Sequence, residues 1–438
     1  MACQGVRDRD SGREEASATV VRPAICASVV RPAICAGVVR PAICGGVVRP
    51  AICAGVVRPA ICSGATAGNR RWSRHPRARI AAVVLSLLLA ACLGWYLGRG
   101  PAEQTNTTFM PAASFLRTYV RPDGRVNRPD QGNDTVSEGQ AYGLLLAETM
   151  GQDSQFNRIW QWTRVHLQRS DGLFAWHANA AGRILSPEPA SDADLLIAWA
   201  LLRYQGPGAA VFHSDGLRVA NAVLAYEVTT GAGGMPILTA GPWATGRPAT
   251  LDPSYWSLPA LTGLAQLTGN REWQQLADSA VVLTRQLTNG GRLLPPNWAE
   301  LTTTHRVLRV LPEVAPNANG TEPLAQYGLD SQRTVAWFAA SCNPQARVLA
   351  ARWWKLLRPS VRDGALALRL NGTVVTPTSG ALPLVAAASA AHAAGAKAAS
   401  LRLLGQAVVE QRLYPGYYGG AWAAFGPVLI RTNVLGGC

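Results

Sequence analysis

The stretch "TVSEGQAYGLLLAE" (residues 135–148) places one carboxylate, Glu138, at the start of an otherwise apolar segment. Its apolar residues recur at spacings of three and four, which predicts a buried helix beginning near residue 137. Thr135 and Ser137 are candidate N-caps, and an acid in a first helical turn commonly complements the helix dipole. Taken alone, Glu138 therefore has a capping interpretation beside a functional one.

The same helical spacing continues to the C-terminus and predicts twelve helices, with starts near residues 108, 137, 154, 191, 210, 254, 271, 330, 343, 379, 395 and 418. No alternating pattern predicts strands. Helices in short-linked pairs favour an all-α domain of stacked helical hairpins, either an open solenoid or a closed ring. The longest connections should form its rims and clefts, at 170–190, 231–253, 290–327 and 359–378.

Two more predicted helices begin with acids. "SDADLLIAWALL" (191–202) opens with Asp192 and Asp194, one carboxylate more than capping by Ser191 needs. "LDSQRT" (329–334) opens with Asp330, followed three residues later by an arginine on the same face. For that pair the simplest interpretation is a structural salt bridge.

A closed ring would bring these acids together, because alternate helices run parallel and their N-termini share one end. Glu138, Asp192 and Asp330 would then meet in one cleft. Neighbouring carboxylates push their pKa values apart, so that one stays protonated and another ionised. Such a pair of acids is the equipment for glycoside hydrolysis.

Aromatic side chains would complete a sugar site, since pyranose rings stack on them. The chain has 14 Trp, and the aromatics near turns are the better candidates because a tryptophan is more often part of a core. The candidates are Trp176, Tyr255, Trp256, Tyr417 and Tyr418.

The strings "VSEGQAYGLLLAE", "SDADLLIAWALL", "DPSYW" and "LDSQRT", in this order, closely resemble glycoside hydrolase family 8. The resemblance runs from about Phe115 to "YYGGAWAAFG" near the C-terminus. The family includes endoglucanases that accompany bacterial cellulose synthases, chitosanases and xylanases. Membership would imply an (α/α)6 barrel and inversion at the anomeric carbon.

The resemblance also implies roles for individual residues. Glu138 would be the general acid and Asp330 the general base, with Asp192 binding and distorting the sugar. The residues expected to bind substrate are Trp176, Tyr255, Arg333, Asp194, Tyr417 and Tyr418. Two positions depart from the family pattern: Leu329 stands where many relatives have Tyr, and Asn297 where relatives often have Asp.

The front of the chain differs in kind. Residues 20–64 repeat a nine-residue unit of the type "VVRPAICAG" five times. A proline in every copy and the lack of a helical or alternating apolar face predict a disordered region over 1–69, or a duplicated tract translated from a start site upstream of the true one. A thiol-rich metal-binding or cross-linking stalk is the alternative.

Five arginines between residues 70 and 79 precede an apolar run at 80–97, which predicts a signal anchor or signal peptide over 70–99 and export of the domain at 106–438. "LAAC" ending at Cys92 also resembles a lipoprotein cleavage box. Of the formal charge of +15, residues 1–105 carry +9. That placement favours a membrane surface over nucleic acid, and no basic stripe with aromatics follows.

The expected function is therefore an exported endo-acting hydrolase of β-1,4-linked glucan. Its expected partners are the β-linked polysaccharide, the membrane through residues 80–97 and a polysaccharide synthase, with a monomeric catalytic domain. The alternatives are a glycan-binding or assembly protein with little turnover, and a chitosanase or xylanase. No metal or cofactor motif is present, because the histidines show no ligand spacing with each other or with cysteine. Within the catalytic domain, Cys342 and Cys438 could pair or remain free.

Overall fold

The computed structural model describes residues 101–302, 308–311, 326–360 and 365–436, with side chains from residue 107 onward. They belong to one compact unit, Gly98–Cys438. The predicted repeat region and signal anchor lie outside the described residues. None of the helices within the described ranges has the length and apolar character needed to cross a membrane.

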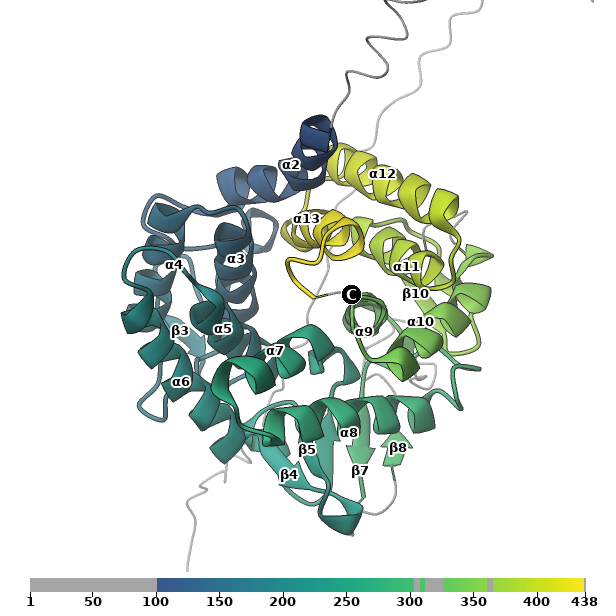
Figure 1. Ribbon diagram of the computed structural model, residues 1–438, viewed down its shortest axis with the longest axis horizontal. Helices are drawn as coiled ribbons and strands as arrows, with labels where there is room; N and C mark the ends of the chain where they lie inside the picture. The colour runs from purple at the N-terminus through teal and green to yellow at the C-terminus, as the bar shows by residue number, and fades with distance from the viewer. Residues whose placement is uncertain (1–100, 303–307, 312–325, 361–364, 437–438) are drawn as a thin grey trace, which may run out of the picture. The chain divides into compact units, whose positions relative to one another are not determined.

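Within the described residues, twelve α-helices form two concentric rings (Figure 1). The inner helices are α3 (Ser137–Thr149), α5 (Ser191–Arg203), α7 (Leu258–Thr268), α9 (Leu329–Ala339), α11 (Ala381–Ala393) and α13 (Tyr417–Arg431). The outer helices are α2 (Pro101–Tyr119), α4 (Asp153–His166), α6 (Ala209–Tyr226), α8 (Glu272–Leu287), α10 (Pro344–Leu357) and α12 (Lys397–Leu413). Each inner helix contacts the next, and α13 contacts α3, which closes the ring. The closed ring of helical hairpins is confirmed in a mostly helical domain, and the open solenoid is excluded.

The two rings differ in sequence for a physical reason. An inner helix has neighbours on every side, so α5 buries nearly every residue from Ser191 to Leu202 and α11 is a run rich in alanine. An outer helix buries one face only, and α8 accordingly alternates buried Leu276 and Leu283 with exposed polar residues. Small residues on the inner helices let the helices approach one another closely.

Most helix starts agree with the predictions, and two differ. The first helix begins at Pro101 instead of near 108, and the helix predicted near 254 begins at Leu258. A 3-10 turn, Pro253–Tyr255, occupies the predicted start because Asp252 accepts the Ser254 N–H there at 2.8 Å. Cys342 is disulfide-bonded.

Short strands occupy the long connections, and the expectation of a strand-free domain was wrong. Within the described residues they form four small antiparallel sheets. The first sheet contains β1 (Thr135–Val136), β2 (His177–Ala178) and β3 (Ile184–Ser186), and the second contains β4 (Val228–Thr230) and β5 (Pro236–Leu238). The third contains β6 (Ala249–Leu251), β7 (Ala299–Leu301) and β8 (Leu308–Val310), and the fourth contains β9 (Gln326–Tyr327), β10 (Ala367–Arg369) and β11 (Val374–Thr376). Strands of two or three residues are too short to show alternation. The connection before α3 pairs with the one before α5, through Val136 opposite His177, and so links the two helix starts.

Candidate active site

Arg333 in α9 joins the first turns of three inner helices. Its Nη1 donates to Glu138 Oε2 at 2.8 Å and to Asp192 Oδ2 at 2.7 Å, and its Nη2 donates to Asp330 Oδ1 at 3.2 Å. The three acids predicted to meet therefore do meet, at the N-terminal ends of α3, α5 and α9. The salt bridge expected between Asp330 and Arg333 is present, as one of three ion pairs to the same guanidinium.

The "DPSYW" segment holds Arg333 from another side. Asp252 caps the short 3-10 turn, which places Ser254 Oγ 2.7 Å from Arg333 Nη2. The ring of Tyr255 lies under the guanidinium, with its centroid 5.2 Å from Arg333 Cζ, a cation–π contact. The side chain of Arg333 is 3% exposed, so its charge is matched by buried partners instead of water.

Glu138 is not a capping residue. The N-cap of α3 is Val136, with no side-chain capping bond, and Thr135 lies in β1, so both predicted caps were wrong. Burial raises the pKa of Glu138 to about 7, against the opposing charge of Arg333, and the neighbouring Asp192 and Asp330 raise it further. Glu138 therefore holds a proton in mildly acidic solution that an ordinary glutamate would lose.

Asp192 is the most enclosed of the three acids and Asp330 the most open. The side chain of Asp192 is 6% exposed, compared with 20% for Glu138 and 38% for Asp330. Burial raises the pKa of Asp192, and Arg333 opposes the shift. Ser191 does not cap α5, because its hydroxyl donates to Thr239 O at 2.5 Å. Water can reach Asp330 most easily.

Their shared partner limits the separation of Glu138 and Asp330. The two Nη atoms of a planar guanidinium lie about 2.3 Å apart. Given the two hydrogen-bond lengths, the facing oxygens are at most roughly 8 Å apart, which does not exceed the upper limit of the range of about 6.5–9.5 Å for an inverting acid–base pair. Among the described residues, no group of three or more His, Cys, Asp or Glu side chains could hold a metal ion.

The neighbouring side chain of Tyr417 explains why residue 139 is a glycine. A Cβ at this position would lie 2.8 Å from the hydroxyl of Tyr417. That hydroxyl donates to Glu138 Oε1 at 3.4 Å. Tyr417 is 2% exposed and packs on Phe115. It therefore holds Glu138 through its hydroxyl and offers no open ring face to a sugar.

Other predicted aromatics lie beside the acids. Trp176 is partly exposed, stacks on His177 at 4.7 Å between ring centroids, and its carbonyl accepts the Ser137 N–H at 2.9 Å. Tyr255 covers Arg333. The hydroxyl of Tyr418 is buried without a hydrogen-bond partner, and the charges of Arg333 and Glu138 act on its pKa, which burial raises.

Several residues of this region were not predicted. Asp134 Oδ2 bonds both Arg128 Nη2 at 2.6 Å and His177 Nε2 at 2.7 Å. Trp243 is 52% exposed, and its indole N–H donates to Pro189 O just before α5. These residues are recognised as part of the site only because the fold places them next to a helix start. No local sequence signal carries that information.

Asp194, predicted to bind substrate, lies apart from the three acids that meet at Arg333. It is 0% exposed, and its Oδ1 accepts the Phe174 N–H at 2.9 Å. Its other partner is the carboxyl of Glu227, also 0% exposed, at the C-terminal end of α6. Asp194 Oδ2 and both oxygens of Glu227 have no other donor. Burial raises the pKa of both acids well above the ordinary range, with smaller contributions from Asp192 and Asp171.

The two departures from the family pattern have different consequences. Asn297 is 2% exposed, and its Oδ1 accepts the Gly328 N–H at 2.9 Å, the Ser331 N–H at 3.1 Å and the Ser331 hydroxyl at 2.7 Å. Asn297 thus supplies a cap to α9, directly beside Asp330, and an asparagine retains the acceptor that this cap needs. Leu329 is 43% exposed at the first position of α9.

Known proteins are similar to this chain in sequence. Residues 101–310 match the family described as "Glycosyl hydrolases family 8". The chain is 31% identical over 255 residues to a probable endoglucanase of Novacetimonas hansenii, covering 55% of this chain and 70% of that protein. It is 33% identical over 200 residues to an endoglucanase of Cellulomonas uda, covering 44% of this chain and 55% of the relative.

Solved structures share its fold. A family 8 endoglucanase from Klebsiella pneumoniae superposes with a TM-score of 0.61 at 25% identity, covering 73% of this chain and 98% of that one. The endo-β-1,4-glucanase CMCax from Acetobacter xylinum gives a TM-score of 0.60 at 23% identity, over 74% and 97% of the two chains. The family resemblance of the four motifs is confirmed, and this chain is a member of glycoside hydrolase family 8.

Proposed function

We propose that this protein is an endo-acting hydrolase of β-1,4-linked glucan, of the cellulase type. The observation that carries the proposal is the convergence of Glu138, Asp192 and Asp330 on Arg333. The relatives from Novacetimonas hansenii and Cellulomonas uda are named as a probable endoglucanase and an endoglucanase, which supports β-glucan as the substrate class. Chitosan and xylan remain the alternative substrates.

Glu138 would donate its proton to the glycosidic oxygen. Its pKa of about 7 keeps that proton available in mildly acidic to neutral solution. The glycosidic bond then breaks towards this oxygen, while a water molecule attacks the anomeric carbon from the opposite face of the sugar. Asp330, the most open of the three acids, would accept the proton of that water. The product is the α-anomer, because the attack inverts the configuration.

Asp192 and Arg333 would act on the sugar at the cleavage point. Both are nearly fully buried and tied to each other, so they are rigid groups of opposite charge beside the acid and the base. Trp176 and Tyr255 would provide faces on which sugar rings stack, and Tyr418 a free hydroxyl for a sugar oxygen. Together these contacts would hold the bond near Glu138 and Asp330.

The test follows the anomer released by the Gly98–Cys438 unit, using proton NMR of fresh digests of carboxymethylcellulose, chitosan and xylan oligomers. We expect early α-anomer from the cellulose derivative. The Glu138→Gln variant should lose roughly 100-fold or more in kcat, because it has no proton to donate. Initial β-anomer, or unchanged activity in Glu138→Gln, would contradict the assigned roles. Cleavage of chitosan or xylan alone would change the substrate.

We also propose that the domain acts outside the cytoplasmic membrane. The support is the run of arginines followed by the apolar segment at 80–97. An association with a polysaccharide synthase would place the enzyme at a newly made polymer. Cell fractionation with external protease tests the location: the domain should sediment with membranes and be cleaved in intact spheroplasts. Recovery in the cytosol would contradict the proposal.

A further inference from the structure

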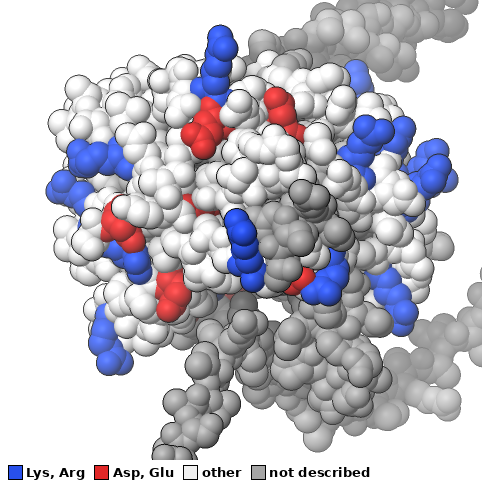
Figure 2. Space-filling model, turned by 90° about the horizontal axis from the view of Figure 1, so that it is seen from below, with Lys and Arg blue, Asp and Glu red and all other residues white. Residues whose placement is uncertain are grey.

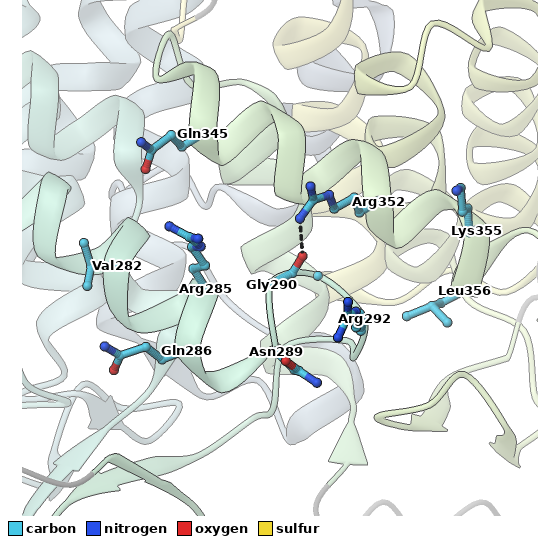
Figure 3. A pocket seen from close by; sticks show the side chains of 11 residues that line it. Val282, Arg285, Gln286, Asn289, Gly290, Arg292, Gln345, Arg352, Lys355 and Leu356 are labelled. Atoms are coloured by element: carbon cyan, nitrogen blue, oxygen red, sulfur yellow. Dashed lines mark hydrogen bonds between the residues drawn. The ribbon is translucent and has the colours of Figure 1, made fainter.

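A cavity of about 910 Å³ lies on the outer wall of the ring, away from the Arg333 cluster (Figure 3). It is formed by the second half of α8, the turn that follows α8, and one side of α10. The lining residues are Val282, Arg285, Gln286, Asn289, Gly290, Gly291, Arg292, Gln345, Arg352, Lys355 and Leu356. No role in the proposed hydrolysis involves any of them.

The lining contains four cations and no acid. The cations are Arg285, Arg292, Arg352 and Lys355, and none of them forms an ion pair within the described part of the chain. Helix α10 has no acidic residue at all. On the face seen in Figure 2, Lys and Arg side chains also gather towards the right-hand edge, where no described acidic side chain is in view.

Helix dipoles explain only part of this charge. Arg285 lies in the last turn of α8 and Lys355 in the last turn of α10, where a cation stabilises the helix end. Arg292 follows α8 by several residues, and Arg352 lies more than one turn before the end of α10. Four like charges around one space repel each other, so an anion between them would be stabilised.

The turn after α8 gives the cavity a defined shape. Asn289, Gly290 and Gly291 all have positive φ, at 47°, 66° and 84°. This conformation points the Gly290 carbonyl at α10, where it accepts from Arg352 Nη1 at 2.6 Å. A Cβ on Gly291 would lie 3.0 Å from Arg352 Cβ, so the glycine lets the turn approach the helix. Arg352 is therefore held in place, with its other guanidinium N–H groups free to donate.

The chemistry of the lining selects a class of ligand. Three guanidinium groups match the oxygens of a phosphate in pairs of hydrogen bonds, and a lysine adds a point charge. A compact group with two or more charges suits four cations around one cavity better than the widely spaced carboxylates of an acidic polysaccharide. Val282 and Leu356 add apolar surface at the edge, and the volume is that of a small-molecule site.

We infer that the cavity between α8 and α10 binds a phosphate-bearing ligand, either a free phosphate ester or the headgroup of an anionic phospholipid. A membrane source would fit the predicted anchor, and a free source would make the cavity a small-molecule site. The site is separate from the acids at the helix N-termini, so its occupation and hydrolysis can be measured independently.

Calorimetric titration of the full chain with pyrophosphate, and co-sedimentation with phosphatidylglycerol vesicles, test the inference. We expect at least one probe to bind, pyrophosphate with a Kd below about 1 mM. The double variant Arg285→Gln/Arg292→Gln should weaken that binding roughly tenfold or more. Neither side chain makes a hydrogen bond or ion pair within the described residues, so folding should be unaffected, as checked by its thermal midpoint.

The matched control is Arg402→Gln/Arg412→Gln on the outer helix α12, which removes the same charge from a helix that does not line the cavity (Figure 1). This variant should bind as the unchanged protein does. If only the cavity variant loses binding to pyrophosphate, the ligand is a free phosphate. If only the cavity variant loses binding to vesicles, and pyrophosphate does not bind, the ligand is a lipid headgroup. Absence of binding to both probes, or equal loss in both double variants, would overturn the inference.

Discussion

At the scale of single residues, burial raises the pKa of Glu138 and Arg333 opposes that rise. Arg333 donates to three carboxylates and to Ser254, and its positive charge is what keeps the pKa of Glu138 from rising above about 7. A lysine has one nitrogen and could not reach all four partners in these directions. The residue thus affects both the position and the protonation of the proposed acid.

Replacing Arg333 tests these two effects separately. Arg333→Gln removes the charge, so the pKa of Glu138 should rise and the alkaline limb of the kcat/KM profile should move to higher pH. Arg333→Lys keeps a charge, so its limb should move less, while kcat falls roughly 100-fold from misplacement. An alkaline limb that stays in place in Arg333→Gln would show that Glu138 does not control it. Arg218→Gln on α6 is the surface control.

At the scale of elements, the starts of the inner helices are fixed by residues that do not touch substrate. Asn297 caps α9 from the preceding connection, and the Asp194–Glu227 pair joins the start of α5 to the end of α6. Asp192 and Asp330 each lie within three residues of one of these contacts. The precision of the site therefore depends on contacts between elements.

The cap on α9 can be compared with an equivalent cap elsewhere. Asn297→Ala should cost about 1–2 kcal/mol in the free energy of unfolding and lower kcat, because Asp330 loses its fixed helix start. Asn343 caps the outer helix α10 in the same way. Asn343→Ala should cost about 1 kcal/mol with kcat unchanged. Chemical denaturation and initial rates measure both, and equal loss of kcat in the two variants would contradict the role of Asn297.

The buried carboxyl pair should make stability depend on pH. Its pKa values are raised in the folded chain, so the folded state keeps a proton that the unfolded chain releases above about pH 4. Stability should therefore fall as pH rises from there towards the folded pKa values. Asp194→Asn supplies a donor to Glu227 without a titrating proton, and the fall between pH 5 and 8 should shrink by roughly 1 kcal/mol or more.

Asp215→Asn is the control for this prediction. Asp215 is also buried on α6, but Trp160 Nε1 donates to it at 2.9 Å and Arg218 pairs with it. Its replacement should lower stability at every pH without flattening the profile. A profile of Asp194→Asn parallel to that of the unchanged protein would mean that the pair shares no proton.

At the scale of the whole molecule, closure of the ring makes the domain one cooperative unit. Helix α13 packs against α2, α11 and α12. It also contacts α3, so the last inner helix closes the ring against the first inner helix. Its Trp422 and Phe425 are 0% exposed and lie against Tyr142 of α3. Removing α13 would open the inner ring and expose aromatic core.

Two fragments test this cooperativity. The Gly98–Cys438 unit should show a single thermal transition with a midpoint within about 2 °C of that of the full chain. A fragment ending at Leu413 lacks α13 and should show no cooperative transition. Differential scanning calorimetry measures both. A cooperative transition in the shorter fragment would show that ring closure is not required for folding.

The sequence by itself determined the twelve helices, the family and the three acids at helix starts. These features are local: apolar spacing, turn residues and short motifs are visible within a dozen residues. The sequence also placed Arg333 beside Asp330, because residues three apart share one helix face.

Only the tertiary structure decided that Arg333 also holds Glu138 and Asp192, and that Asp194 turns inwards to Glu227. It decided as well that Tyr417 supports Glu138, that Asn297 caps α9, and that two- and three-residue strands join the connections. Each of these contacts is made between segments far apart in the chain. Their partners are chosen by ring closure and burial, which no local pattern encodes.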